Sequence, residues 1–575
     1  MSTGGPSYFH AVISEPLIGS TIADHIDKVA SSRLDAPALV SIDEGVRLSY
    51  GELAREADRL AMAFLAAGLE KGDRIGIWST NNSQWFVIFL AAARTGLILV
   101  NINPGYRTAE LEYAINQSGL KMLFTIVRNR TSDYLAMLHE IAPQVFSGSS
   151  PKSLSRCAGL ETIVVIDPDE IAEDQYSFNE TFLPFERLCD QAAFSSPEEL
   201  EGRRRTVQFD SPVNIQYTSG TTGFPKGVTL SHHSLINNAY QAAVAMEIDR
   251  ESRFCVPMPF YHCGGMISSA LATLSVGGCV VIPSPFFTDL PTLKAVQSES
   301  CTHISGVPTM FIAQLEHPEF KSFDLSSLKG GFMAGAPCPV QLMRRVISEM
   351  HLSGLVILYG LTESSPLMTA TTTRDSLEKR ATTVGRAIPG VELKVIDTET
   401  GAVVERGTQG EICCRGHLVM MGYWQDEKAT GDAIDRSGWL HSGDLGVLSE
   451  DGYLNITGRK KDMICRGGEN VYPREIEEVL HTHDQISQAQ VFGVPDHRLG
   501  EEVALWVMPK PQVVLDPEEL KTWLKDRVAH FKVPRYIKIV EEFPLTVTGK
   551  PRKFVMRDQM IEELGLELAA EVETA

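Results

Sequence analysis

The chain contains 575 residues, and its 73 acidic residues outnumber its 52 lysines and arginines, which gives a formal net charge of −21. Nucleic acids and anionic membranes bind basic surfaces, so this acidic excess argues against both as bulk partners. A hydrophobic fraction of 43% and a charged fraction of 22% are ordinary for packed globular proteins and exclude a largely disordered chain. At about 100–200 residues per domain, the length predicts about three to five compact units.

Cysteine usage and hydropathy narrow the class of protein further. Ten cysteines are scattered without a Cys-x-x-Cys motif, which argues against a compact zinc module and against a disulfide scaffold. The longest apolar stretch, 85–100, is interrupted by Arg94 and is shorter than the roughly 20 residues of a membrane span. No secretory, transit or peroxisomal signal is recognised, so we expect a cytoplasmic protein, with the peroxisome or the mitochondrial matrix as alternatives.

The first part of the chain alternates helical and strand-like segments. Residues 49–140 combine amphipathic helices with short apolar runs, the pattern of a sheet flanked by helices. The stretch from Ser147 to Arg205 is polar and patchy, and we expect it to form loops and insertions. The alternation of helical and strand-like segments resumes from 213 to 365. The helices expected are 50–66 and 85–94, and the strands expected are 74–78, 97–101, 213–217, 279–283, 303–307 and 356–359.

From about Val391 the pattern changes to short alternating segments with glycine turns, at 392–396, 410–414 and 453–456, which predicts a small β-rich unit. The adjacent Cys413 and Cys414 are interpreted as the interior of one of these strands. Beyond Lys461 a compact α+β piece is expected. Its first helix begins at Pro473, a residue suited to a first helical turn, and places Ile476, Val479 and Leu480 on one face.

The strongest local signal is the run Tyr-Thr-Ser-Gly-Thr-Thr-Gly-Phe-Pro-Lys-Gly from Tyr217 to Gly227, which follows an apolar strand and precedes a helix expected near Ser231. Glycines let the backbone approach a ligand, consecutive amides form a concavity, and hydroxyls with Lys226 add donors. The chemistry is that of a phosphate cradle, although the spacing is not that of a Walker loop. The alternative is a Gly/Thr-rich surface turn, which six successive Ser, Thr and Gly residues (Thr218 to Gly223) disfavour.

This run and five further motifs, in order along the chain, resemble the adenylate-forming superfamily of acyl-CoA synthetases, luciferases and nonribosomal adenylation domains. The further motifs are Gly335-Ala336-Pro337, Tyr359-Gly360-Leu361-Thr362-Glu363, Trp439-Leu440-His441-Ser442-Gly443-Asp444, Gly458-Arg459-Lys460-Lys461-Asp462 and Pro544-Leu545-Thr546-Val547-Thr548-Gly549-Lys550. Over nearly the whole chain the sequence is most similar to the medium-chain acyl-CoA synthetase family member 2 type.

The resemblance implies a fold and a domain division. It implies an α/β protein whose large N-terminal adenylation domain, 1–460, holds two α/β subdomains to about residue 390 and a small distorted β-barrel over about 391–460. A mobile α+β C-terminal domain, 461–575, is implied after a hinge at Lys461. In this superfamily the small domain rotates between the adenylation and thioester-forming steps.

The resemblance also implies the site residues. Lys550, Glu363 and His262 are expected to be catalytic, with His262 between the acyl pocket and the pantetheine tunnel, and Glu363 with Thr222 is expected to hold Mg²⁺. Residues expected to bind ATP or CoA are Thr218, Ser219, Gly220, Thr221, Thr222, Gly223, Phe224, Pro225, Lys226, Gly335, Ala336, Pro337, Tyr359, Gly360, Thr362, Asp444, Arg459, Lys461, Arg466, Gly467 and Gly468. An acyl pocket is expected beside Gly264, Gly265, Gly331 and Met333.

Each role has a simpler alternative. Glu363 as a solvated loop acid, Asp444 as a turn former, Lys550 as a solvated tail lysine and His262 as a core histidine are all common in proteins. The segment from Arg466 to Asn470 is, in its simpler interpretation, a hairpin bend.

The expected reaction follows from carboxylate chemistry. A carboxylate is a poor acyl donor, and attack on the α-phosphate of ATP supplies AMP as its leaving group, a step that relies on positioning and charge stabilisation. Together with the resemblance, this chemistry implies an AMP-forming acid–thiol ligase that uses ATP, Mg²⁺ and CoA and acts on a carboxylic acid, with a medium-chain fatty acid as the expected substrate. The alternatives are an aryl, hydroxy or branched acid as substrate, a luciferase-like oxygenase of the adenylate, a nonribosomal adenylation module, and a non-enzymatic nucleotide-binding regulator. No oligomeric state is predicted.

Overall fold

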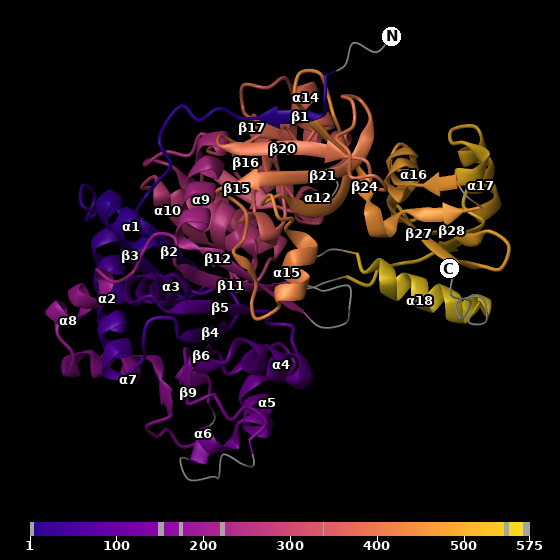
Figure 1. The fold of residues 1–575 in the computed structure, drawn as a ribbon. Helices are drawn as coiled ribbons and strands as arrows, with labels where there is room; N and C mark the ends of the chain where they lie inside the picture. The colour runs from indigo at the N-terminus through magenta and orange to yellow at the C-terminus, as the bar shows by residue number, and fades with distance from the viewer. Residues whose placement is uncertain are drawn as a thin grey trace.

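In the computed structural model the chain forms a large main body and a smaller C-terminal unit beside it (Figure 1). The structure describes residues 5–147, 155–171, 176–218, 225–336, 338–467, 469–545 and 551–566. The main body contains two large sheets separated by helices and a β-rich unit. This architecture confirms the α/β class and the two α/β subdomains expected from the sequence.

The first sheet has eight strands in the order β10-β9-β6-β4-β5-β11-β12-β22. All neighbours from β10 to β11 run parallel, and β12 and β22 are antiparallel additions at one edge. The strand bounds are β4 (Arg74–Trp78), β5 (Ile98–Ile102), β6 (Leu120–Thr125), β9 (Thr162–Val165), β10 (Phe182–Pro184), β11 (Pro212–Thr218), β12 (Lys226–Ser231) and β22 (Gly422–Tyr423).

The second sheet has nine strands in the order β19-β18-β17-β16-β15-β13-β14-β2-β3, parallel from β17 to β2. The strand bounds are β2 (Pro37–Ser41), β3 (Val46–Ser49), β13 (Arg253–Cys255), β14 (Cys279–Ile282), β15 (His303–Gly306), β16 (Gly330–Met333), β17 (Gly354–Tyr359), β18 (Thr369–Ala370) and β19 (Arg386–Ala387). Parallel strands need helical crossovers, so both sheets are covered by helices on their faces.

Helices between the two sheets share one continuous apolar core with them. This layer includes α2 (Tyr50–Ala66), α3 (Gln84–Thr95) and α9 (His232–Met246). Helix α3 is buried almost all round, since every residue from Trp85 to Thr95 is buried. The start of α2 is specified locally by a capping box, in which Ser49 accepts from the Glu52 amide and Glu52 accepts from the Ser49 amide.

The outer faces of the two sheets have their own apolar clusters. The first sheet is covered by α4 (Thr108–Ser118) and α5 (Tyr134–Ile141), and the second by α11 (Asp289–Ser298), α12 (Pro308–Glu316) and α13 (Val340–Glu349). Further helices of the main body are α1 (Ile22–Ala30), α6 (Pro143–Ser147), α7 (Phe185–Asp190), α8 (Pro197–Arg204), α10 (Ala272–Ser275), α14 (Leu377–Thr382) and α15 (Glu427–Ala433).

The β-rich unit is a five-stranded antiparallel sheet in the order β1-β20-β21-β23-β24. Its bounds are β1 (Tyr8–His10), β20 (Val391–Ile396), β21 (Gln409–Gly416), β23 (Leu440–Leu448) and β24 (Leu454–Arg459). Cys413 and Cys414 are buried in β21, as expected. The edge strand β1 comes from the opposite end of the chain, a pairing that no local pattern signals.

The C-terminal unit packs around its own apolar clusters. Its sheet runs β26-β25-β28-β27, with β29 parallel to β28. The bounds are β25 (Ile464–Arg466), β26 (Glu469–Val471), α16 (Pro473–Leu480), β27 (Ile486–Asp496), β28 (Gly500–Pro509), α17 (Pro517–Lys525), β29 (Tyr536–Ile539) and α18 (Lys553–Leu564). Helix α16 begins at Pro473 and buries Ile476 and Leu480, as predicted.

One expectation about local structure is wrong. The stretch up to Arg205 contains β9, β10, α7 and α8 rather than only loops, because short apolar runs such as Thr162–Val165 pair with neighbouring strands of the first sheet. The helix expected near Ser231 is confirmed, since α9 begins at His232 with Ser231 as its N-cap. Before it, Lys226 begins strand β12, which pairs antiparallel with β11. The glycine-rich loop therefore joins two antiparallel strands.

Candidate functional site

Asp444 is the centre of a network built from three strands of the main body. The Tyr359 hydroxyl, at the end of β17, donates to Asp444 Oδ2 at 2.8 Å, and Arg459 Nε donates to Oδ1 at 2.9 Å. Asp444 and Arg459 are directly opposite each other in the β23–β24 pair. Asp444 is only 4% exposed. The sequence motifs containing these three residues are thus brought into contact, and Asp444 lies in a strand rather than in a turn.

The charge state of this network is fixed by its surroundings. Burial, with the nearby Asp444 carboxylate, raises the pKa of the Tyr359 phenol well above its ordinary value, so the hydroxyl remains a donor. The Asp444 carboxylate likewise raises the pKa of Arg459. A carboxylate offers about four acceptor positions, and two are occupied here. Asp444 therefore keeps the capacity to accept from a pair of neighbouring hydroxyls on a ligand.

Glu411 supports the strand that carries Asp444 and was missed in the sequence. It is buried, and its carboxylate accepts from the Gly443 amide at 3.3 Å and pairs with Lys460 Nζ at 3.4 Å. The Asp444 amide is in turn held by Ser442 Oγ at 3.0 Å. The one signal for Glu411 in the sequence was that a charged residue interrupts an otherwise apolar, alternating strand.

Lys226 and Glu363 meet through a third residue, Tyr423, which no motif had indicated. The Tyr423 hydroxyl donates to Glu363 Oε1 at 2.8 Å, and Lys226 Nζ lies 5.0 Å from the centroid of the same ring. Burial, with the Glu363 carboxylate, raises the pKa of Tyr423 far above its ordinary value. Glu363 is thus an oriented carboxylate rather than a freely solvated one.

The glycine-rich loop is framed at its base by Thr218 and Pro225-Lys226. Thr218 and Lys226 are opposite each other in the β11–β12 pair, and Thr218 Oγ1 lies 3.5 Å from the Lys226 carbonyl oxygen. The other residues expected in the cradle, Ser219, Gly220, Thr221, Thr222, Gly223 and Phe224, lie outside the described residues.

The side chains around Glu363 show how the expected Mg²⁺ could be bound. Among the residues that the structure describes, no group of three or more His, Cys, Asp and Glu side chains is arranged to hold a metal ion. Mg²⁺ is usually held by one or two carboxylates together with substrate phosphates rather than by an all-protein cage. A single oriented carboxylate close to Lys226, at the base of the loop expected to bind phosphate, fits that mode of binding.

Residues 360 to 362 connect this region to the expected gate. Gly360 allows a close approach, since a Cβ there would lie 1.9 Å from the Pro366 carbonyl oxygen. Thr362 is nearly buried, and its Oγ1 lies 3.7 Å from Cys263 Sγ. Cys263 adjoins His262, whose Nδ1 accepts from the Gly264 amide at 3.3 Å. His262 is half-buried, and it is its neighbour Cys263 that contacts Thr362 of the 359–363 motif.

The remaining expected residues belong to the turn from Gly335 to Pro337 and to the acyl pocket. Gly335 adopts a left-handed conformation with φ of 82° at the end of β16, and Ala336 follows it half-buried. In the expected acyl pocket, a Cβ on Gly331 would lie 1.9 Å from the Ile304 carbonyl oxygen, and one on Gly265 would lie 2.4 Å from that of Pro259. Backbone packing alone therefore requires both glycines, and Met333 is buried in the cluster under α11–α13. Pro337 lies outside the described residues.

Beyond the main body, the expected hinge and CoA residues belong to the C-terminal unit. Lys461 lies in a short 3₁₀ turn (Lys460–Asp462) between β24 and β25, where the surrounding protein and the Arg459 charge lower its pKa. Arg466 does not join the Asp444 network, because both its Nε and Nη2 donate to the buried Glu502. Gly467, with φ of 60°, forms the β25–β26 hairpin bend.

Two expected residues of the C-terminal unit, Gly468 and Lys550, lie outside the described residues. The segment that carries Lys550 is closed at its base, since Leu545 bridges to Pro551 and the Arg552 amide donates to the Pro544 carbonyl at 2.8 Å. The two flanks of the segment 546–550 are therefore joined to each other.

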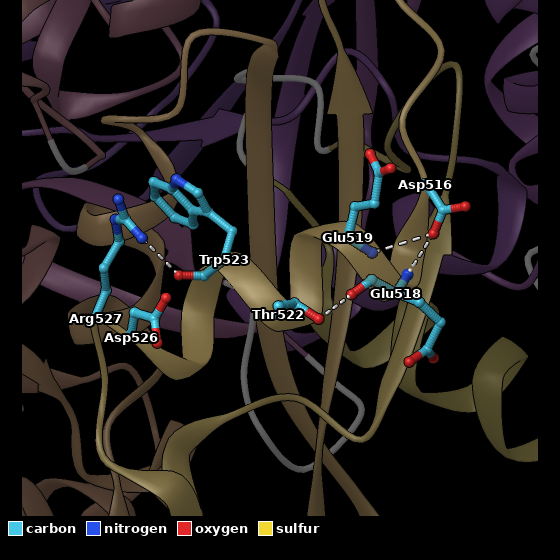
Figure 2. Close-up of a pocket in the computed structure, with 7 residues that line it drawn as sticks. All are labelled: Asp516, Glu518, Glu519, Thr522, Trp523, Asp526 and Arg527. Carbon is cyan, nitrogen blue, oxygen red and sulfur yellow. Dashed lines mark hydrogen bonds between the residues drawn. The ribbon is translucent and has the colours of Figure 1, made fainter.

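A surface hollow over helix α17 has no part in this site (Figure 2). Asp516 caps the helix by accepting from the amides of Glu518 and Glu519 at 2.7 and 3.1 Å. The lining comes from this one helix and its two ends, and none of the residues predicted for the site belongs to it: Asp516, Glu518, Glu519, Thr522, Trp523, Asp526 and Arg527.

Comparison with known proteins gives the family. The family model described as AMP-binding enzyme matches residues 26–424, and the AMP-binding enzyme C-terminal domain matches residues 475–550. The chain belongs to the AMP-binding enzyme family. This confirms the resemblance seen in the sequence and, with it, the expected class of enzyme, an AMP-forming carboxylate–CoA ligase.

Relatives of this AMP-binding enzyme match along almost their whole length. YngI of Bacillus subtilis (strain 168) is 40% identical over 551 residues, covering 96% of this chain and 99% of its own. The mitochondrial medium-chain acyl-CoA ligase ACSF2 of Bos taurus is 39% identical, covering 98% of this chain and 92% of its own. ATP-bound MatB from Rhodopseudomonas palustris superposes with a TM-score of 0.78 at 27% identity, covering 93% of this chain and 98% of its own. Within the described residues, no helix has the length and apolar character needed to cross a bilayer.

Proposed function

We propose that this AMP-binding enzyme is an ATP-dependent acyl-CoA synthetase that activates a medium-chain fatty acid through an acyl-adenylate. In the first half-reaction a carboxylate oxygen attacks the α-phosphorus of ATP, and the bond to the β-phosphate breaks to release pyrophosphate. In the second, the CoA thiol attacks the acyl carbon, its proton is released, and AMP leaves.

The observation that carries the proposal is the buried Asp444 carboxylate between Tyr359 and Arg459. Residues from three strands meet at the Asp444 carboxylate, whose remaining acceptor capacity suits the two hydroxyls of a ribose. Arg459 adds a planar, permanently charged group at the exposed side of the same carboxylate, suited to ribose or phosphate oxygens.

The phosphate end of ATP is assigned to Lys226 and Glu363. Lys226 is the first residue of β12, directly after the glycine-rich loop. Its ammonium offers positive charge to the phosphate chain of ATP. Glu363 and Thr222 would hold Mg²⁺, which supplies charge neutralisation of the phosphate oxygens when bound. Lys550 is assigned to the substrate carboxylate and the α-phosphate, where charge develops during adenylation.

The C-terminal domain, 461–575, is assigned the switch between half-reactions. It would turn about Lys461, withdraw Lys550 from the adenylate, and present Arg466, Gly467 and Gly468 to the pantetheine arm of CoA. His262 would line the junction of acyl pocket and tunnel. Support for this division is that the unit has its own apolar clusters, so it keeps its fold while its position changes.

The choice of a medium-chain acid is supported by similarity to the Bos taurus medium-chain acyl-CoA ligase over 98% of this chain. The test is a panel of C2–C18, branched, hydroxy and aromatic acids, assayed in parallel for pyrophosphate release and CoA thioester. We expect both products to peak with C6–C12 acids. A peak with an aryl, hydroxy or branched acid would assign the chain to another carboxylate, and oxygen-dependent turnover without thioester would replace the ligase assignment by an oxygenase.

A further inference from the structure

Tyr423 lies at the edge of the first sheet, next to the strand that begins with Lys226. Strand β22 pairs antiparallel with β12, with Tyr423 opposite Val228. The pairing is extended by the Trp424 amide, which donates to the Gly227 carbonyl at 2.7 Å. The backbone of Tyr423 is therefore fixed relative to the exit of the glycine-rich loop.

Helix α15 fixes the same residue from the other side. The Tyr423 amide donates to Thr430 Oγ1 at 2.9 Å. Its neighbour Gly422 has φ of 141°, and a Cβ there would lie 2.9 Å from Thr430 Cγ2, so the close contact between β22 and α15 requires glycine. The Tyr423 side chain thus projects from a backbone that is held on both sides.

One aromatic side chain contacts both charged groups assigned to the phosphate end of ATP. Its hydroxyl donates to Glu363 Oε1 at 2.8 Å, and its ring lies 5.0 Å from Lys226 Nζ. The hydrogen bond fixes one carboxylate oxygen and therefore the direction of the other. The ring face attracts the ammonium without neutralising it.

Lys226 and Glu363 form no direct ion pair in the part of the chain that the structure describes; each interacts with Tyr423 instead. A direct pair would let each group neutralise the other and would compete with ligand for both.

We propose that Tyr423 is a positioning residue of the adenylation site, which holds Lys226 and Glu363 apart and oriented so that the ammonium meets the phosphate chain while the carboxylate meets Mg²⁺. The inference rests on the proposed function, which assigns those two ligands. It adds a residue outside the phosphate-loop and Tyr-Gly-x-Thr-Glu motifs.

The test uses the full chain with Tyr423→Phe, which keeps the ring and removes the hydroxyl, and Tyr423→Leu, which removes both contacts. Tyr453→Phe is the matched control, because the Tyr453 hydroxyl also donates to a carboxylate, Asp375 Oδ1 at 2.5 Å, and its ring also contacts cations. ATP affinity is measured by calorimetry with and without Mg²⁺, and ATP–pyrophosphate exchange and thioester formation from supplied acyl-adenylate are measured alongside.

For Tyr423→Phe we expect Mg²⁺-dependent ATP binding to weaken about tenfold, as for loss of a hydrogen bond to a charged group, with metal-free ATP binding unchanged. Tyr423→Leu should also weaken metal-free binding, because the Lys226 contact is lost. Thioester formation from supplied adenylate should stay within about twofold of wild type, and the control should match wild type throughout.

The outcomes separate this inference from the proposed function. Absence of exchange by the wild-type enzyme with every acid tested would refute the proposed function. An active wild-type enzyme with a Tyr423→Phe variant indistinguishable from it would refute the positioning role alone. If Tyr423→Phe weakened ATP binding equally with and without Mg²⁺, or slowed thioester formation as much as it weakened ATP binding, the hydroxyl would have a general structural role and the inference would be overturned. If the Tyr423→Leu protein does not fold, the result for Tyr423→Phe alone tests the positioning role of Tyr423.

Discussion

Asp444 and Arg466 lie in neighbouring parts of the sequence, yet their surroundings are organised in different ways. Asp444 is held by Tyr359 and Arg459, from two other strands of the main body. Arg466 is paired with Glu502, which belongs to its own C-terminal unit and is only 1% exposed. The groups proposed to bind the nucleotide are thus assembled in the main body, while the groups expected to serve CoA are held within the smaller unit.

Among the residues that the structure describes, a short turn and a local contact link the two regions. The chain crosses from β24 to β25 through the turn Lys460–Asp462, and Tyr472 packs over Gly458, where a Cβ would lie 3.6 Å from the ring. Each region has its own apolar clusters. We therefore expect ATP affinity to depend mainly on the main body, whereas the choice of half-reaction should depend on where the C-terminal unit lies.

The largest expected effect comes from removing the group that the C-terminal unit delivers. Lys550→Ala should slow adenylation by about 10²–10³-fold, the range for loss of one preorganised charge-stabilising group. Thioester formation from supplied acyl-adenylate should be retained, because in the proposed cycle the C-terminal unit has by then withdrawn this lysine. The measurement is ATP–pyrophosphate exchange beside single-turnover thioester formation.

The control for that experiment is Lys510→Ala, which removes an exposed lysine of the same unit. It should leave both half-reactions unchanged. Equal loss of both half-reactions in Lys550→Ala would show that the lysine is not specific to adenylation, and the comparison between the two regions would lose its main support.

A smaller effect is expected at the centre of the main-body network. Asp444→Ala should weaken ATP binding by about 10–100-fold, since hydrogen bonds to a charged acceptor are lost and Arg459 is left without its partner. Calorimetric titration with ATP measures it, and the thermal midpoint shows whether the fold is intact. Unchanged nucleotide affinity in a folded variant would refute the ribose assignment.

The strands and helices of the main body could be predicted where apolar periodicity is long, as in α2, whose bounds Tyr50–Ala66 match the expectation. Short strands that gain their stability from other segments could not be predicted, as for β1 beside β20 and β10 beside β9. Periodicity within a segment cannot show such pairing, because it depends on the partner.

The same limit applies to the site. Asp444, Arg459 and Tyr359 lie in motifs with a chemical rationale, and the structure brings them together. Tyr423 and Glu411 carry no motif, and their importance comes from the contacts that folding creates. The partner of Arg466, Glu502, could not be inferred either, because strand register sets that pair.

The connection between the regions is tested by stiffening it. Lys461→Pro should slow thioester formation about tenfold or more while leaving adenylation close to wild type, because the proline ring fixes φ at the turn between the units. Lys461→Ala is the control that removes the side chain without restricting the backbone. Normal overall turnover in the proline variant would show that the rotation does not pass through this residue.

The smallest effect sharpens the comparison within the main body. Tyr359→Phe removes one hydroxyl from Asp444 and keeps the ring, so ATP binding should weaken by about 3–10-fold, the range for a single hydrogen bond. Tyr8→Phe is the matched control, because the Tyr8 hydroxyl donates to Glu392 Oε2 at 2.7 Å on the surface of the β-rich unit. Thioester formation from supplied adenylate should fall no more than ATP affinity does, since the Asp444 network also holds the bound AMP moiety. If Tyr359→Phe slowed only thioester formation, the Tyr359 hydroxyl would serve the step assigned to the C-terminal unit. That result would contradict the division of roles between the two regions.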